Sequence, residues 1–188
     1  MAAQRADTQW PRFEVFQQTR EGAPFQNVGS VHAPDAEIAM QNARDVFVRR
    51  PQTVSLWVVP AAAILARTAQ ELADEQPWHE ETTVGEPVHV YHIFQKTSQR
   101  RSMHYVTYSG EVLAATLEQA LQAAVARYGD KTTYVWWVVP EDKIIRSEAE
   151  DAPSMFRPAQ RKSYRMPTGY HTRTMMREVR AQQEEQEE

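Results

Sequence analysis

The chain of 188 residues contains no cysteine. This absence excludes disulfides, thiolate metal sites, iron–sulfur ligation and cysteine nucleophiles. The six glycines form neither a phosphate-binding loop nor a dinucleotide fingerprint, which disfavours nucleotide hydrolysis and hydride transfer. No serine stands in a nucleophile-elbow motif, so the sequence indicates no catalytic triad and no catalytic residue.

Long apolar runs and a dominant charge are also missing. No stretch approaches the roughly 18 apolar residues of a membrane span, and the N-terminus has neither the basic start nor the apolar run of a signal peptide. We therefore expect a cytoplasmic protein without a membrane partner. The net charge is only −4, so the overall balance does not point to nucleic acid. With 41% hydrophobic residues, the chain can bury a core.

The histidines do not predict a metal site. The stretch "EPVH" at 86–89 formally matches the Glu-x-x-His pattern of di-iron helical bundles. That pattern requires a helix, whereas Pro87 and the following "VHVYHIF" indicate a strand, in which residues three apart point to opposite faces. We predict no metal and no cofactor, and we expect His89 and His92 at a surface or an interface.

What the sequence does contain is an internal repeat. "VGSVHAPDAEIAMQNARDVFVRR" (28–50) is followed by "SLWVVP" (55–60), and "SGEVLAATLEQALQAAVARYG" (109–129) is followed by "VWWVVP" (135–140). An offset of 81 places Gly29 on Gly110 and the expected helix cap Asp35 on Thr116. Such self-similarity is typical of a duplicated folding unit. We assign the first repeat to residues 8–67 and the second, divergent repeat to 88–150.

Each repeat predicts the order strand, strand, helix, strand. In the first copy we expect strands at 13–17 and 27–33, joined by a turn at Gly22 and Pro24, and a helix from the cap Asp35 to about Arg50. A continuous apolar strand follows at 54–59, and a short helical turn at 61–66. The fold class is therefore α+β: two tandem ββαβ repeats, with mainly antiparallel sheet and a helix on one face, in a pseudo-two-fold, dimer-like arrangement.

Two further segments differ in charge. Residues 68–87 hold six acidic and no basic residues and are expected to form a linker. Residues 151–188 are expected to form an extended basic tail with a disordered acidic end. The tail either remains a solvated surface segment or lies on an acidic partner or on phosphates. Trp57, Trp136 and Trp137 favour a core or a subunit interface over an aromatic ligand pocket.

The stretches "WPRFEVF" (10–16), 28–50 and "SLWVVP" closely resemble the family of B subunits of the phenylacetyl-CoA epoxidase complex, the phenylacetic acid degradation proteins. The second copy is divergent, with "ARYG" in place of "NARD". The C-terminal motif of the family matches only after the second copy, at Arg157, Pro158, Ala159, Tyr164, Arg165 and Pro167. This distribution indicates a fusion of two copies in which the first tail was lost.

The resemblance implies a non-catalytic structural or bridging subunit of a multicomponent di-iron ring monooxygenase in aerobic phenylacetate degradation. The implied partners are the catalytic di-iron oxygenase subunit, a structural oxygenase subunit and a flavin and iron–sulfur reductase. An alternative is an acyl-CoA-binding or regulatory module of a related aromatic oxygenase.

We place the partner-binding surface on the first helix and on the tail. Its candidate residues are Asn42, Arg44, Asp45, Arg49, Arg50, Tyr164 and Arg165. Asn42, Asp45 and Arg49 lie on one side of a helix because they are three, four and seven residues apart. A solvated helix face without a partner is the alternative interpretation.

Overall fold

The computed structural model describes residues 9–48, 53–74, 87–100, 102, 104–129, 132–161, 176–179 and 182. The strands are β1 (Arg12–Gln18), β2 (Gln26–His32), β3 (Ser55–Pro60), β4 (Leu65–Thr68), β5 (His89–Lys96), β6 (Thr107–Ala114), β7 (Val135–Pro140) and β8 (Ile145–Arg146). The helices are α1 (Ala36–Phe47), α2 (Ala69–Asp74), α3 (Leu117–Tyr128) and α4 (Ala152–Arg161), with short 3-10 turns η1 (Ala61–Ala63) and η2 (Glu141–Lys143).

Both long helices begin at the predicted caps. The Asp35 carboxylate accepts a hydrogen bond from the Ile38 amide at 2.8 Å, and the Thr116 hydroxyl accepts one from the Gln119 amide at 3.2 Å. These bonds satisfy backbone donors that the first turn of a helix leaves unpaired. Helix α1 ends at Phe47, before the predicted end at Arg50, which lies outside the described residues.

All eight strands form one sheet, in the order β4-β7-β5-β6-β2-β1-β3-β8, and every neighbouring pair is antiparallel. The α+β class and the mainly antiparallel sheet are thus confirmed, as is the hairpin of β1 and β2. The sheet is joined in the middle by a short contact in which Gln26 of β2 pairs with Thr107 of β6.

Two edge strands pair across the sequence halves. Strand β4 follows β3 in the chain but pairs with β7, with Leu65 opposite Val138. Strand β8 follows β7 but pairs with β3, with Arg146 opposite Trp57. Of the helical turn predicted at 61–66, only η1 is present, because the chain turns into β4 at Leu65.

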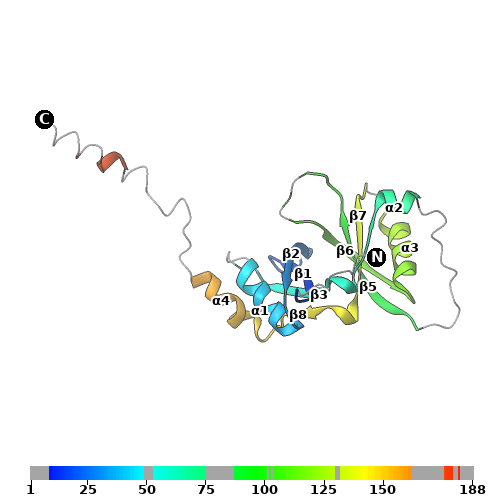
Figure 1. Cartoon of the computed structure of the whole chain (residues 1–188), viewed down its shortest axis with the longest axis horizontal. Coiled ribbons are helices and arrows are strands. Elements are labelled where there is room, and N and C mark those ends of the chain that lie inside the picture. Colours follow the sequence, from blue (N-terminus) through cyan, green and yellow to red (C-terminus); the bar gives the residue numbers. More distant parts are fainter. Residues whose placement is uncertain are drawn as a thin grey trace, which may run out of the picture.

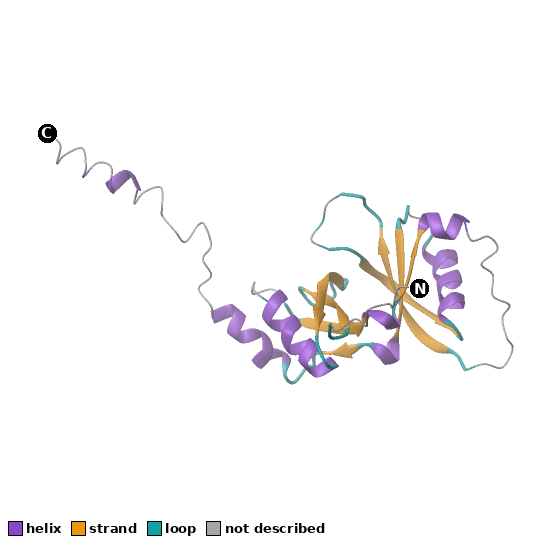
Figure 2. Cartoon of the chain, viewed as in Figure 1, coloured by secondary structure: helices purple, strands orange, loops and turns teal. Residues whose placement is uncertain are grey.

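Apolar side chains form three clusters. One lies under α1, a second under α3, and the third contains residues from the sheet faces that point away from these helices. In the third cluster the rings of Phe16 and Phe94 are 4.3 Å apart, between β1 and β5. Helices α1 and α3 lie at opposite ends of the folded body (Figures 1 and 2). The third cluster is rich in aromatic residues and takes side chains from both halves.

Helices also occur in the two segments that the sequence assigned to a linker and a tail. Helix α2 lies within 68–87, and α4 opens the segment expected to be extended. Each helix packs on the half in which its preceding strand is paired: Leu72 of α2 contacts the cluster under α3, and Phe156 of α4 belongs to the cluster under α1. Within the described residues, no helix is long and apolar enough to cross a membrane.

Candidate functional site

The predicted partner residues of α1 do not form one cluster. The side-chain amide of Asn42 donates to the backbone carbonyl oxygen of His32 at the end of β2, at 3.2 Å. Arg44 pairs with its neighbour Asp45 at 2.8 Å, and both side chains remain well exposed. Asn42 is therefore engaged within the chain, whereas the Arg44–Asp45 pair is accessible. Arg49, Arg50, Tyr164 and Arg165 lie outside the described residues.

Helix α4 extends the surface of the first half beside α1 (Figure 1). Its Phe156 is only 4% exposed because the ring enters the apolar cluster beneath α1, where Ala152 and Met155 also pack. The helix is connected through β8, whose edge is fixed by bonds from the Ser147 amide to the Leu56 carbonyl (2.8 Å) and from the Leu56 amide to the Ser147 hydroxyl (3.0 Å). The second half of the chain thus contributes to the surface of the first.

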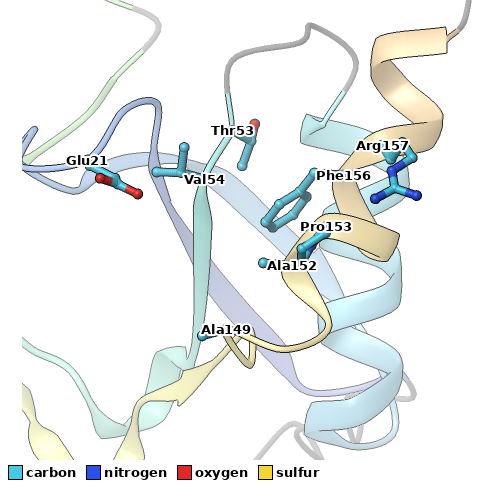
Figure 3. Close-up of a pocket in the computed structure, with 8 residues that line it drawn as sticks. All are labelled: Glu21, Thr53, Val54, Ala149, Ala152, Pro153, Phe156 and Arg157. Atoms are coloured by element: carbon cyan, nitrogen blue, oxygen red, sulfur yellow. The ribbon is translucent and has the colours of Figure 1, made fainter.

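A groove of about 460 Å³ lies between α4 and the start of β3 (Figure 3). Val54, Ala152 and Phe156 contribute apolar surface, and the carboxylate of Glu21 and the guanidinium of Arg157 lie on opposite sides. Its volume falls within the range of small-molecule sites. However, the described lining offers one cation and one anion, which is poorly suited to the several phosphates of an acyl-CoA. The lining fits a short, mixed polar and apolar protein segment better.

The tryptophans lie where the core prediction expected them. Trp57 and Trp136 are 8% and 4% exposed. Trp57 stacks on Phe25 with ring centroids 3.7 Å apart, and Trp137 meets Phe16 edge-on at 6.1 Å. These rings belong to the shared core and to the cluster under α3, as the core interpretation expected.

A polar cluster surrounds the buried His92 and lies beside Trp57 of the other half. The side chain of His92 is 4% exposed, and its Nε2 is in direct contact with the Glu141 carboxylate. The Arg146 guanidinium binds the same carboxylate at 2.7 Å and lies 4.8 Å from the Trp57 ring. Because Arg146 stands on β8 and His92 on β5, Glu141 connects the edge strand that pairs with β3 of the first half to a central strand of the second half.

The remaining contacts of this cluster come from β6. The Tyr108 hydroxyl donates to Glu111 at 3.2 Å and lies 3.4 Å from His92 Nδ1. The hydrogen bond from Arg146 and the contact with His92 lower the pKa of Glu141 to about 2. Burial and the neighbouring Glu111 raise the pKa of Tyr108 well above its usual value. The cluster therefore combines an ionised carboxylate with a neutral phenol at neutral pH.

This cluster was not predicted from the sequence. The signal in the sequence is that the two predicted repeats carry different side chains at the positions of this cluster: His92 aligns with Glu14, Glu111 with Ser30 and Glu141 with Ala61. His89 is exposed on β5 while His92 is buried, so the two histidines do not act together. No group of three or more potential metal ligands occurs in the described part of the chain.

Comparison with known proteins gives two findings. The sequence model of the family described as Phenylacetic acid degradation B matches residues 9–82 and 88–177. Over 62 residues the chain is 44% identical to the B subunit of 1,2-phenylacetyl-CoA epoxidase from Escherichia coli (strain K12). That alignment covers 33% of this chain and 65% of the relative, so the chain spans slightly less than two thirds of the relative's length. No solved structure matches.

Proposed function

Since the chain belongs to the phenylacetic acid degradation B family, we propose that it is a cytoplasmic, non-catalytic subunit of a multicomponent phenylacetyl-CoA epoxidase. In this role it bridges heterodimers of the catalytic di-iron oxygenase subunit and its structural partner, and it helps the flavin and iron–sulfur reductase to engage. The observation that carries the proposal is the family match over two stretches that together make one continuous sheet.

The proposed architecture is a tandem duplication with an internal pseudo-two-fold axis. Its support is the strand order, which reads the same from both ends when β4 is equated with β8, β7 with β3, β5 with β1 and β6 with β2. The contact of Phe16 with Phe94, which occupy matching positions of the two repeats, lies where such an axis would pass. A duplicated chain would replace a symmetric dimer and free each half to specialise.

The division of labour between the halves is part of the proposal. The first half carries more of the oxygenase-binding surface, on α1 with Asn42, Arg44 and Asp45 and in the sequence after it with Arg49 and Arg50. The second half contributes mainly structural contacts and the C-terminal tail with Tyr164 and Arg165. The location of α4 on the first half supports this division, because it directs the start of the tail toward the α1 surface.

Co-expression with the catalytic and structural oxygenase subunits of the same organism, followed by size-exclusion chromatography, tests the bridging role. We expect one complex containing all three chains, and neither turnover nor bound iron in the isolated chain. Charge reversal at Arg44, Arg49 and Arg50 should weaken the complex. Reversal of the exposed Arg20, Arg100 and Lys143, which lie outside α1 and the tail, is the charge-matched comparison and should leave the complex intact. A wild-type chain that elutes apart from the oxygenase subunits would contradict the proposal.

Calorimetry with phenylacetyl-CoA and the isolated chain distinguishes the bridging role from the alternative, an acyl-CoA-binding module. The bridging role predicts no binding heat in the absence of the oxygenase subunits. Saturable binding to the isolated chain would instead favour the acyl-CoA-binding module.

A further inference from the structure

The outer edge of β2 is unpaired along most of its length. The pairing of β2 with β6 is limited to its first residues: the Asn27 amide donates to the Val106 carbonyl at 2.9 Å, and the Tyr105 amide donates to the Asn27 carbonyl at 3.2 Å. Beyond Asn27, no described strand pairs with β2 on this side. The segment Val28–His32 is therefore an open strand edge next to the short junction with β6. A β-bulge at Val28 separates the two, because Val15 pairs with Gly29 and Phe16 with Asn27.

The direction of the backbone groups along this edge follows from two bonds. The Ala33 amide donates to the Pro11 carbonyl at 3.1 Å, toward the β1 side. Successive residues of a strand direct their N–H and C=O groups to alternate sides. His32 and Ser30 therefore face away from β1, and the His32 carbonyl indeed accepts from Asn42 of α1. Within the described residues, nothing on the open side bonds to the Ser30 backbone.

The matching edge in the second half is closed. Glu111 of β6 occupies the position of Ser30, and its carbonyl oxygen accepts from the Tyr128 hydroxyl at 3.0 Å and from the Arg127 guanidinium at 3.3 Å. At the offset of 81 these two donors correspond to Phe47 and Val46, neither of which carries a side-chain donor. The first half therefore lacks the side chains that cover the equivalent edge in the second.

The side chains along the open edge indicate which kind of segment fits there. Val28–His32 contains no lysine and no proline, two of the residues that commonly protect an exposed strand edge from pairing. The bulge at Val28 lies at the end next to β6, so the stretch Gly29–His32 is regular. The neighbouring face of α1 presents Asn42 and Val46, and Val46 is 45% exposed. An edge of this kind, without acidic or strongly basic side chains and with an exposed valine beside it, fits an uncharged extended segment that brings an apolar side chain to Val46.

We propose that an extended, uncharged segment of an oxygenase subunit adds to β2 as an antiparallel strand along Val28–His32. This inference rests on the proposed function, because that function supplies the oxygenase subunit as the partner. The segment Val28–His32 is the part of the first half that receives the partner. The bound segment lies beyond the bulge at Val28, where the pairing with β6 ends. Its backbone pairs with the outward N–H and C=O of Ser30 and with the outward N–H of His32, whose carbonyl is already bonded to Asn42.

The first test is Ser30→Pro in the full chain, co-expressed with the oxygenase subunits. Proline removes the outward N–H and is tolerated on an edge strand. We expect the apparent affinity for the oxygenase subunits to fall by about tenfold or more, since backbone pairing supplies the affinity in strand addition. Leu113→Pro is the matched control, because it introduces the same ring on the β6 edge at the position equivalent to His32. This control should bind like the wild type.

The second test transfers the covering side chains. Val46→Arg/Phe47→Tyr gives α1 the pair that closes the β6 edge, and the second half already folds with that pair. The variant should keep the wild-type melting temperature and lose affinity to a similar extent. Hydrogen exchange of the wild-type complex should show new protection of the amides in 28–32, which a purely structural role of these residues would not produce.

The outcomes separate the two proposals. If the wild-type chain binds no oxygenase subunit, the proposed function and the strand addition both fail. If the wild type binds and both edge variants bind equally well, only the strand addition is overturned. Light scattering of the isolated chain tests whether a second copy of the chain binds this edge instead. A wild-type dimer that Ser30→Pro converts to a monomer would show that a second copy occupies the edge, and this result would also overturn the proposed strand addition.

Discussion

Glycines 29 and 110 occupy matching positions in β2 and β6, and both have backbone conformations that favour glycine. Their φ angles are +135° and +154°. An aromatic side chain from the end of the following helix lies directly over each one. A Cβ added at Gly29 would stand 3.0 Å from the Phe47 ring, and one added at Gly110 would overlap the Tyr128 hydroxyl oxygen. Both the backbone angle and the packing therefore disfavour any side chain.

Alanine at either position should destabilise the protein, and Gly110→Ala should do so more. We expect a loss of about 1–3 kcal/mol at Gly29 from backbone strain, and a larger loss at Gly110, where the Tyr128 ring must also move and its bond to Glu111 breaks. Urea unfolding measures both values. Gly22→Ala is a control with positive φ but open space around it. Equal losses at all three sites would show that packing by the aromatic rings contributes nothing.

The Glu141 carboxylate makes stability depend on acidic pH. Its pKa is lowered to about 2 in the folded protein, chiefly by the Arg146 hydrogen bond and also by His92. A depressed folded pKa contributes stability above the unfolded value near 4.5, and this contribution is lost as the pH falls toward 2. The stability difference between wild type and Glu141→Gln should therefore be largest above about pH 5 and shrink between pH 5 and 3. Thermal melts across this range provide the measurement.

Glu14, at the matching position of His92, should show the opposite dependence. Burial raises its pKa, although Asn27 and Arg12 partly compensate. A raised folded pKa contributes stability at low pH that is lost as the pH rises. Relative to wild type, Glu14→Gln should therefore gain stability on going from pH 4 to pH 7. The same trend in both variants would contradict the assignment of opposite pKa shifts.

At the scale of elements, α4 is held by a single large side chain. Phe156 is 4% exposed and contributes to the cluster under α1, whereas Arg157 beside it is exposed on the groove. Phe156→Ala should cost about 3 kcal/mol of unfolding free energy, at the low end for a buried phenylalanine because α4 lies at the periphery. Arg157→Ala should change stability by less than about 0.5 kcal/mol. Denaturant unfolding of the two variants compares these costs directly.

The elements that the sequence predicted are those with a local signal. The caps Asp35 and Thr116, the apolar spacing of α1 and the continuous apolar run of β3 are each contained within a short window. Strands β4 and β8 have four and two residues, and their partners are β7 and β3 of the other half. Such pairing depends on contacts distant in sequence, so no local pattern indicates it.

The difference between local patterns and contacts distant in sequence also explains which parts of the candidate site could be predicted. The helix that carries Arg44 and Asp45 was located by its periodicity, but the bond of Asn42 to His32 depends on how α1 crosses the end of β2. His92, Glu141 and Arg146 come from β5, η2 and β8, and only the folded chain brings them together. The open β2 edge became recognisable only because the second half showed which side chains would close it.

At the scale of the whole molecule, the two sequence halves depend on each other for folding. The segment 9–74 contains β4, whose pairing partner β7 lies in the segment 87–161, and the latter contains β8, whose partner β3 lies in the former. The shared core adds Phe16 and Phe94, both fully buried between the halves. Separating the halves would expose these rings and leave two edge strands unpaired.

We therefore expect that fragments 1–80 and 81–188 do not form folded monomers on their own but assemble when co-expressed. A tag on one fragment should recover the other, and the pair should show the far-ultraviolet spectrum and melting behaviour of the intact chain at high concentration. Phe94→Asp in the second fragment should abolish recovery, because it places a charge where the Phe16 ring lies 4.3 Å away. Leu113→Asp, at a side chain that is 68% exposed, is the control that should leave recovery intact. A first fragment that is monomeric and cooperatively folded would show that the exchange of β4 and β8 is dispensable, and the shared core would then be an interface between independent domains.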